Sequence, residues 1–305
     1  MIILTVLRME RNGFRLSQNN RSVETLVILV CVLLAGSVLS FAQTEQPHSR
    51  IPQTEVPGRR IELKTLQGAV LYTGTGFNAK GRVPLIVHFH GAPWLVQYQI
   101  AEQCPRAALI TVQLGAGSSV YGRPFEKTDA FERLIDEARR ELALSRAWAS
   151  ITLTGFSAGY GAIRAILRND KSFSRVDNVL LLDGIHASYT PEGVVLSNGG
   201  VIRAADLDSF VEFGREAVAG KKSFVISHSA IFPAAYASTT ECTNFLIETL
   251  GLRRRMSSLE TRTGMQQRSV VDVKGFHVRG YSGSTAPDHV DHLHSMTEWL
   301  RLLSI

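Results

Sequence analysis

Residues 151–161 read ITLTGFSAGYG, and this stretch decides the fold. Its first four residues form a short apolar and β-branched run, which predicts a strand. A helix is expected over 158–168, because apolar residues recur there at helical spacing. Between the two elements, Gly155 and Gly159 flank Ser157 in the pattern G-x-S-x-G. The strand–turn–helix context is the one in which this pattern carries a nucleophilic serine.

The chemistry explains the small residues. A nucleophilic serine needs a sharp, strained turn that exposes its hydroxyl, and a side chain on either flank would collide with the neighbouring strand or helix. The alternative is an ordinary glycine–serine turn between two elements. We favour Ser157 as the nucleophile because of the elements on both sides of it.

Strands and helices alternate along the chain on either side of this motif. An antiparallel pair is expected at Ile61–Thr65 and Ala69–Thr73. Further strands are expected at Leu85–His90, Ala108–Leu114, Val176–Leu182, Ser223–Ser227 and Arg268–Val273, and further helices at Thr128–Leu144, Ala205–Ala219, Thr240–Leu250 and Pro287–Leu303. The alternation from residue 85 onward predicts a mainly parallel sheet with helices on both faces. In such sheets, active groups lie at the carboxyl ends of the strands.

A second motif, His90-Gly91-Ala92-Pro93, follows the strand that ends at Phe89. With the serine motif, it makes residues 60–305 resemble the α/β-hydrolase superfamily, whose HG-x-P loop supplies an oxyanion hole. The resemblance implies an α/β fold with a mainly parallel sheet of about eight strands, and the backbone N–H groups of Ala92 and Ala158 as oxyanion donors. The short segment between Asp183 and Ser223 leaves no room for a large cap domain.

The family order places a histidine base after the last strand. His289, His292 and His294 all lie there. Thr285 and Asp288 match a capping box, which predicts that the helix begins near Ala286. At about 100° per residue, His289 lies in the middle of the apolar face of this helix, His292 about 60° away, and His294 well away from it. We therefore predict His289 as the base and keep His292 as the alternative.

The acid departs from the usual family pattern. No carboxylate follows the strand Ser223–Ser227 until Glu241, which matches a capping box with Ser238. Asp183 ends the preceding strand, and some superfamily members, such as pancreatic-type lipases, place the acid there. A buried carboxylate needs a partner, which an imidazole N–H would supply. We predict Asp183 as the acid, with Glu241 as the alternative and a turn cap as the structural explanation of Asp183.

Residues 1–42 are predicted to be a secretion signal. Basic residues precede an apolar run, Leu26–Leu39, and Ser40-Phe41-Ala42 offers small residues before a cleavage site at Gln43. The alternative is an uncleaved membrane anchor, although the run is shorter than a spanning helix requires. Residues 43–58 predict a flexible leader, and 59–305 the hydrolase domain. Localisation is therefore expected to be secreted or periplasmic.

Composition excludes several partners. The chain has 305 residues, 45% hydrophobic, with a net charge of +6. Its basic residues form no stripe with aromatic residues, so no nucleic-acid partner is expected.

Cys104 and Cys242 are either a disulfide or two small buried side chains. A zinc site would need three converging ligands. Ligand-type side chains occur at Asp288, His289, Asp291, His292 and His294 and at His88 and His90, but no HExxH motif occurs, so neither a metal nor another cofactor is expected.

The sequence therefore predicts a secreted serine hydrolase that cleaves carboxylic esters through an acyl-enzyme, acting on small-molecule or polymer-borne esters. Trp94 and Tyr121 are expected to line the substrate site, with Tyr189 nearby. Two alternatives remain open: a serine peptidase or amidase with the same machinery, and a catalytically inactive binding protein on this scaffold.

Overall fold

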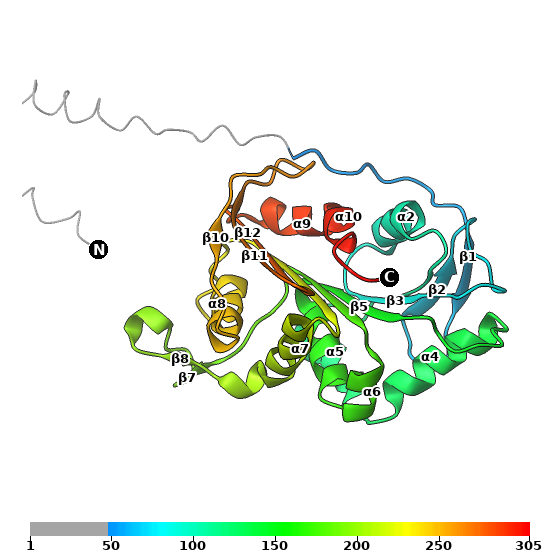
Figure 1. Cartoon of the computed structure of the whole chain (residues 1–305), viewed down its shortest axis with the longest axis horizontal. Helices are drawn as coiled ribbons and strands as arrows, with labels where there is room; N and C mark the ends of the chain where they lie inside the picture. Colours follow the sequence, from blue (N-terminus) through cyan, green and yellow to red (C-terminus); the bar gives the residue numbers. More distant parts are fainter. Residues whose placement is uncertain (1–47) are drawn as a thin grey trace, which may run out of the picture. The chain divides into compact units, whose positions relative to one another are not determined.

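A mixed β-sheet forms the centre of the protein in the computed structural model, which describes residues 48–305 (Figure 1). The strand order is β1-β2-β4-β3-β5-β6-β9-β12-β11-β10. Neighbouring strands from β4 to β12 are parallel, and the pairs at both ends of the sheet are antiparallel. The strands are β1 Arg59–Glu62, β2 Ala69–Thr73, β3 Leu85–Phe89, β4 Ala108–Val112, β5 Ile151–Phe156, β6 Asn178–Leu182, β9 Ser223–His228, β10 Arg255–Met256, β11 Gln267–Val273 and β12 Phe276–Tyr281.

The sheet confirms a mainly parallel α/β architecture, but it has ten strands rather than about eight. The expected last parallel strand, Arg268–Val273, is wrong in its role, because it lies in β11 and pairs antiparallel with β12. β12, which the sequence analysis missed, is the parallel neighbour of β9. Its residues alternate between buried and half-buried positions at the start, so the apolar pattern is weaker than in the central strands.

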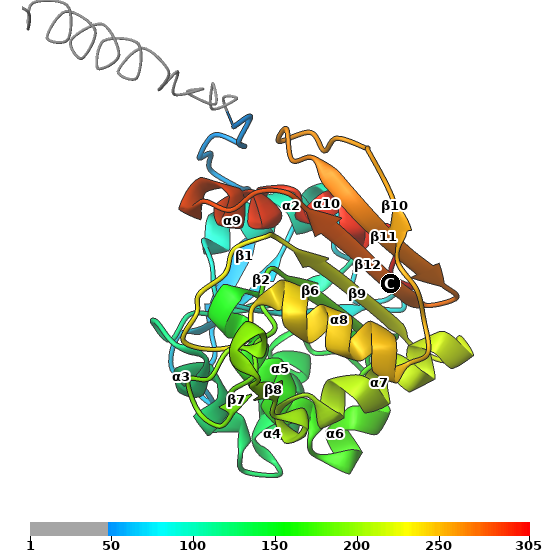
Figure 2. The ribbon, with the colours of Figure 1, turned by 90° about the vertical axis from the view of Figure 1, so that its left-hand side faces the viewer.

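Helices cover both faces of the sheet (Figures 1 and 2). On one face lie α2 Pro93–Gln103, α9 Ala286–His294 and α10 Met296–Leu300. On the other lie α4 Ala130–Glu141, α5 Tyr160–Leu167, α6 Asp170–Arg175, α7 Asp208–Ala219 and α8 Thr239–Thr249. The short helix α3, Ser118–Gly122, packs beside α5. Between β6 and β9 lie only α7, two 3₁₀ turns and the small ribbon β7 Tyr189–Thr190 with β8 Val201–Ile202, so no large cap domain is present in residues 48–305.

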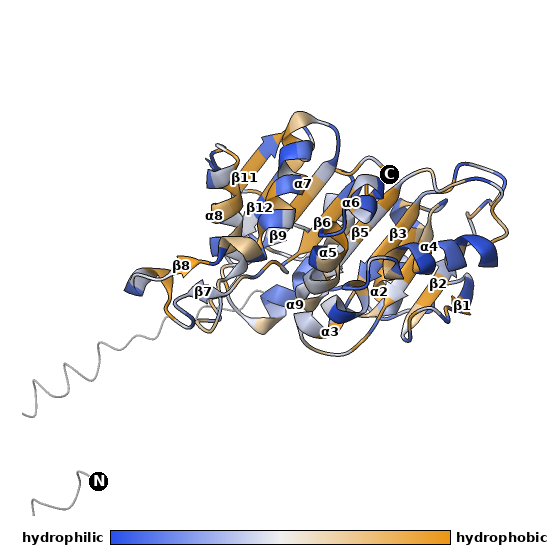
Figure 3. Ribbon diagram, turned by 90° about the horizontal axis from the view of Figure 1, so that it is seen from below, coloured by the Kyte–Doolittle hydropathy of each residue, from blue (hydrophilic) through white to orange (hydrophobic). Residues whose placement is uncertain are grey.

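Two apolar clusters, one on each face, hold these layers together. The central strands are buried along their whole length, and their residues are mostly apolar, as their orange colour in Figure 3 shows. The larger cluster packs them against α4, α5, α7 and α8, and the smaller one packs them against α2, α9 and α10. Strands covered on both faces are typical of parallel sheets with helices on each side.

Two capping boxes begin helices at the expected residues. Ser238 and Glu241 cap α8, and Thr285 and Asp288 cap α9. The C-terminal segment is two helices rather than the single expected one, because α9 ends at the cap residue Ser295. The start of α9 fixes where each of its histidines points.

The N-terminal part of the described chain is irregular from His48 to Pro57 but is not free of contacts. Arg50 donates through Nε to Asp291 Oδ1 at 2.8 Å and through Nη2 to the carbonyl of Pro287 at 2.8 Å. The backbone N–H of Ile51 donates to His294 Nδ1 at 3.1 Å. The expected leader is therefore bound to α9 over its first described residues, a contact that its composition did not indicate. The predicted signal segment, 1–42, lies outside the described residues.

Both cysteines in the described chain are free. Cys242 is fully buried in the larger cluster and Cys104 packs against the smaller one, which agrees with two small buried side chains and not with a disulfide. In residues 48–305, no helix is both long enough and apolar enough to cross a membrane.

Candidate active site

Ser157 lies in the turn between β5 and α5. Its φ is +48°, in the left-handed region that non-glycine residues rarely adopt. A Cβ on Gly159 would stand 2.1 Å from the carbonyl oxygen of Phe89, and one on Gly155 would stand 3.1 Å from the backbone of Gly159. The neighbouring strand β3 and the following helix therefore require glycines here, as the sequence pattern indicates.

Asp183 and His289 meet at the same edge of the sheet. Asp183 follows β6, and His289 lies in the first turn of α9, after β12. His289 Nδ1 lies 2.6 Å from Asp183 Oδ2, within hydrogen-bonding distance. Asp183 is 2% exposed. A carboxylate this deeply buried accepts the imidazole N–H and so fixes the tautomer of the ring.

The second oxygen of Asp183 also has donors. Its Oδ1 accepts from the backbone N–H of Ser229 at 2.9 Å and from the hydroxyl of Thr239 at 2.9 Å. Burial alone would raise the pKa of Asp183, but the nearby imidazoles of His292 and His289, together with the Ser229 N–H, lower it well below its ordinary value. Asp183 is therefore ionised at neutral pH.

Ser157 and His289 line one cavity of about 310 Å³, together with Asp183; we call it the histidine cavity. The His289 ring packs on Phe156, the residue before the serine, with ring centroids 4.6 Å apart. Among the described residues, Ser157 Oγ has no hydrogen bond to His289, and in unliganded sites such bonds commonly form only when substrate is present. The backbone of Gly184 abuts Ser157, since a Cβ there would stand 2.3 Å from its carbonyl oxygen.

The HG-x-P loop follows β3, next to the serine turn. His90 has a φ of +68°, and Ala92 is the N-cap of α2. In the described chain, neither the Ala92 N–H nor the Ala158 N–H donates to a protein acceptor outside its own helix. A hydrogen bond of 2.9 Å between His90 Nδ1 and the hydroxyl of Tyr121 links this loop to α3.

The candidate residues thus follow the order serine, acid, histidine along the chain, at the carboxyl ends of β5, β6 and β12. The chain has the α/β-hydrolase fold. The parallel strand order from β4 to β12 and the strained serine turn between β5 and α5 are the observations that decide it.

Comparison with known proteins shows only distant similarity. No family model matches the chain, and no curated relative matches it by sequence. Among solved structures, a feruloyl esterase module from Clostridium thermocellum is 12% identical, with 83% of this chain and 93% of that chain covered and a TM-score of 0.46. Thermogutta terrifontis esterase 2 is 15% identical, covering 83% and 98%, with a TM-score of 0.47. Carboxyl esterase 2 from Tuber melanosporum is 14% identical, covering 91% and 94%, with a TM-score of 0.45.

The other base and acid candidates lie elsewhere. His292 is fully buried, and its Nδ1 bonds Ser227 Oγ at 2.9 Å. Burial lowers the pKa of His292 to about 4. Glu241 Oε2 accepts from Ser238 and from the hydroxyl of Tyr189, so its carboxylate is used in the cap of α8.

The predicted substrate-lining aromatics do not reach the cavities that contain Ser157. Tyr121 is fully buried, bonded to His90, to Gln113 Oε1 and to the N–H of Leu114. Trp94 packs, partly buried, against the smaller core cluster. Neither side chain lines these two cavities, because hydrogen bonds hold Tyr121 and core packing holds Trp94.

The described chain brings one group of three potential metal ligands together: His48, Asp288 and Asp291. Two of them already have partners, because Asp288 closes the capping box of α9 and Asp291 is paired with Arg50. His88 is not part of this group, because its two ring nitrogens bond Thr154 Oγ1 and the carbonyl of His90. None of these four residues lines the cavity that contains Ser157 and His289.

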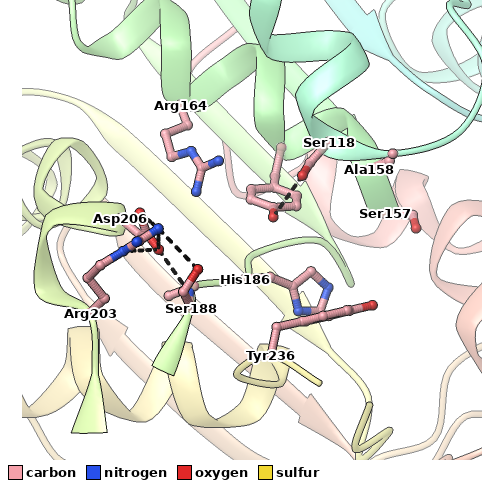
Figure 4. A pocket seen from close by; sticks show the side chains of 12 residues that line it. Ser118, Ser157, Ala158, Arg164, His186, Ser188, Arg203, Asp206 and Tyr236 are labelled. Carbon is pink, nitrogen blue, oxygen red and sulfur yellow. Dashed lines mark hydrogen bonds and ion pairs between the residues drawn. The ribbon is translucent and has the colours of Figure 1, made fainter. Parts of the chain in front are cut away.

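A second cavity of about 460 Å³ also opens on Ser157, and His289 does not line it (Figure 4). We call it the arginine cavity. Besides Ser157 and Ala158, its walls carry a set of polar and aromatic side chains: Ser118, Tyr160, Arg164, His186, Arg203 and Tyr236. The sequence analysis missed this set, since no motif joins residues from α5 with those from the segment between β6 and α8.

Proposed function

We propose that this protein is a secreted serine hydrolase that cleaves carboxylic esters through an acyl-enzyme. Ser157 is the nucleophile, His289 the general base, Asp183 the acid, and the N–H groups of Ala92 and Ala158 form the oxyanion hole. The observation that carries the proposal is the 2.6 Å contact between His289 and the buried Asp183, in a cavity that also exposes Ser157.

The contact sets the protonation of the base. Because Asp183 is ionised and accepts from His289 Nδ1, the proton of the neutral ring resides on that nitrogen. His289 Nε2 is then unprotonated and free to take the proton of Ser157 Oγ as the hydroxyl attacks the acyl carbon. The negative charge of Asp183 then stabilises the imidazolium cation that results from this proton transfer.

The developing negative charge falls on the carbonyl oxygen of the ester. Two backbone N–H groups, at Ala92 and Ala158, have no acceptor in the described chain outside their own helices and are available to it. Each donor of this kind contributes about 3 to 4 kcal/mol to the transition state. His289 then gives its proton to the leaving alcohol, and water releases the acyl group by the same steps in reverse.

A fluorophosphonate probe tests the nucleophile. We expect the purified protein to be labelled, and Ser157→Ala to abolish labelling while the melting temperature stays close to that of the wild type. Ser118→Ala is a matched control, since Ser118 lines the arginine cavity but is not in the strained turn. A folded wild-type protein that stays unlabelled would support an inactive binding protein instead.

The reaction class is tested with matched p-nitrophenyl esters and p-nitroanilides of the same acyl groups. We expect turnover of the esters, abolished in Ser157→Ala. Faster turnover of the anilides, at equal acyl structure, would favour the peptidase or amidase alternative.

We also propose that residues 1–42 direct the chain out of the cytoplasm and are removed. The support is the basic segment followed by the apolar run Leu26–Leu39. N-terminal sequencing of the protein secreted by a bacterial host should begin at Gln43. Recovery of the full-length chain in the membrane fraction would indicate an uncleaved anchor.

A further inference from the structure

Arg164 is the unpaired charge of the arginine cavity. It lies on α5, half-buried, with its guanidinium carbon 5.3 Å from the centroid of the Tyr160 ring. In the described chain its guanidinium forms no ion pair and no hydrogen bond, although its charge is among those that lower the pKa of Asp206. Figure 4 shows the guanidinium directed into the cavity, on the side where Asp206 and Ser188 lie. An arginine that stacks on an aromatic ring with its donors free is arranged to bind an anion.

The second arginine of this cavity is already paired. Arg203 donates to both oxygens of Asp206, from Nε at 3.1 Å and from Nη2 at 3.1 Å. Asp206 also accepts from the backbone N–H of Ser188. Burial lowers the pKa of His186, so its ring is neutral at pH 7. The charges that face the cavity therefore leave an excess of one positive charge, at Arg164, which suits a monoanion such as a carboxylate better than a dianion.

The two cavities that meet at Ser157 would hold different parts of the ester, one the alcohol and the other the acyl chain. The leaving alcohol must lie within reach of His289 Nε2, which protonates it. His289 lines the histidine cavity and is not part of the arginine cavity, whereas Ala158, an oxyanion donor, borders the arginine cavity. The alcohol therefore occupies the histidine cavity, and the acyl chain extends into the arginine cavity.

The distance between Ser157 and Arg164 limits the acyl chain. Arg164 lies seven residues after Ser157, across the 3₁₀ turn Ser157–Gly159 and the first residues of α5, which corresponds to about 12 Å of helical rise. Helical side chains lean toward the N-terminal end of their helix, here the end that carries Ser157. A chain of a few carbon atoms between the ester carbonyl and the anion therefore spans the gap.

We propose that Arg164 is a specificity residue that binds a carboxylate at the far end of the acyl group, so that the preferred substrates are monoesters of aliphatic dicarboxylic acids. The proposal rests on the proposed ester hydrolase activity. It adds the class of acyl group that the site selects.

The test compares mono-p-nitrophenyl adipate and suberate with their methyl esters, which have the same chains without the charge. We expect the wild type to prefer the charged substrate at each length that reaches Arg164. In Arg164→Gln, kcat/KM for the charged substrates should fall about 10- to 100-fold, since a hydrogen-bonded charge is lost. The methyl esters should change by less than about twofold, and Arg164→Lys should restore part of the preference.

Arg168→Gln is the matched control. Arg168 lies one turn further along α5, is exposed, and is outside the arginine cavity, so it removes the same net charge without removing the contact. We expect its preference to equal that of the wild type.

Other outcomes would overturn the inference without touching the hydrolase proposal. If Arg164→Gln loses equal activity on charged and methylated substrates, Arg164 is structural. If instead 4-acetoxybenzoate, which has its carboxylate on the alcohol side, loses activity in Arg164→Gln, the assignment of the two cavities is reversed. Failure of the hydrolase proposal would be seen separately, as absent turnover of every ester and absent fluorophosphonate labelling.

Discussion

Asp183→Asn gives the sharpest test of the proposed triad, because the surroundings of the carboxylate dictate how an amide would sit. Oδ1 of Asp183 faces two donors, the backbone N–H of Ser229 and the hydroxyl of Thr239. A backbone N–H can only donate, so the carbonyl oxygen of the asparagine must take the Oδ1 position. The amide NH₂ then points at His289 Nδ1.

That orientation reverses the tautomer of the imidazole. His289 Nδ1 becomes an acceptor, and the proton of the neutral ring moves to Nε2, the nitrogen that must accept the proton of Ser157. The wrong tautomer cannot act as the base, which lowers kcat about 1,000- to 10,000-fold. This corresponds to about 4 to 5 kcal/mol of transition-state stabilisation.

Initial rates of p-nitrophenyl acetate hydrolysis measure the effect, with melting temperature and near-ultraviolet circular dichroism as checks on folding. Glu241→Gln is the control. Glutamine at this position still closes the capping box of α8, so the rate should stay within about threefold of the wild type. A folded Asp183→Asn that keeps a tenth of the activity, or a collapse of activity in Glu241→Gln, would refute the reasoning.

Three further predictions concern the base, the serine turn and pH. His289→Ala should lose about as much activity as Ser157→Ala, whereas His292→Ala should mainly lower the melting temperature; the reverse pattern in hydrolysis rates would exchange their roles. Gly159→Ala should destabilise the fold by about 2 kcal/mol or more, seen in urea unfolding, since its Cβ would stand 2.1 Å from a backbone carbonyl of β3. Burial lowers the pKa of His88, His228 and His292 to about 4 each, while unfolded histidines titrate near about 6.5. Between the folded and the unfolded pKa, the unfolded chain binds more protons than the folded one. The free energy of unfolding is therefore highest above the unfolded pKa, and it falls by about 2 kcal/mol per histidine between about pH 7 and pH 5. Urea unfolding midpoints that do not fall over this range would contradict the burial of these rings as neutral groups.

Local sequence patterns predicted the parts of the site that depend on neighbours along the chain. The glycines around Ser157 are required by close backbone approach, and the capping boxes are required by unpaired N–H groups at the start of a helix. Both requirements leave a signal within a few residues. The position of His289 followed from the start of α9, which its cap determines.

Features made by distant segments were not predictable in this way. The donors that hold Asp183, at Ser229 and Thr239, come from the loop after β9 and the start of α8, and a serine or a threonine in a loop has no distinctive pattern. β12 was missed because it is only half covered, so its residues lack a continuous apolar run. The burial of Tyr121 was not predicted, because an aromatic residue in a short helix such as α3 can face either a cavity or the core.

The contact between the first described residues and α9 has a practical consequence for protein production. Asp291 is almost fully buried and is paired with Arg50 and His48, on the helix that also carries His289. A recombinant form that starts at Arg59, the first residue of the sheet, would leave this buried carboxylate without Arg50 and His48, which destabilises α9. Expression vectors should therefore keep His48 and Arg50, and an affinity tag belongs at the C-terminus or behind a spacer upstream of His48.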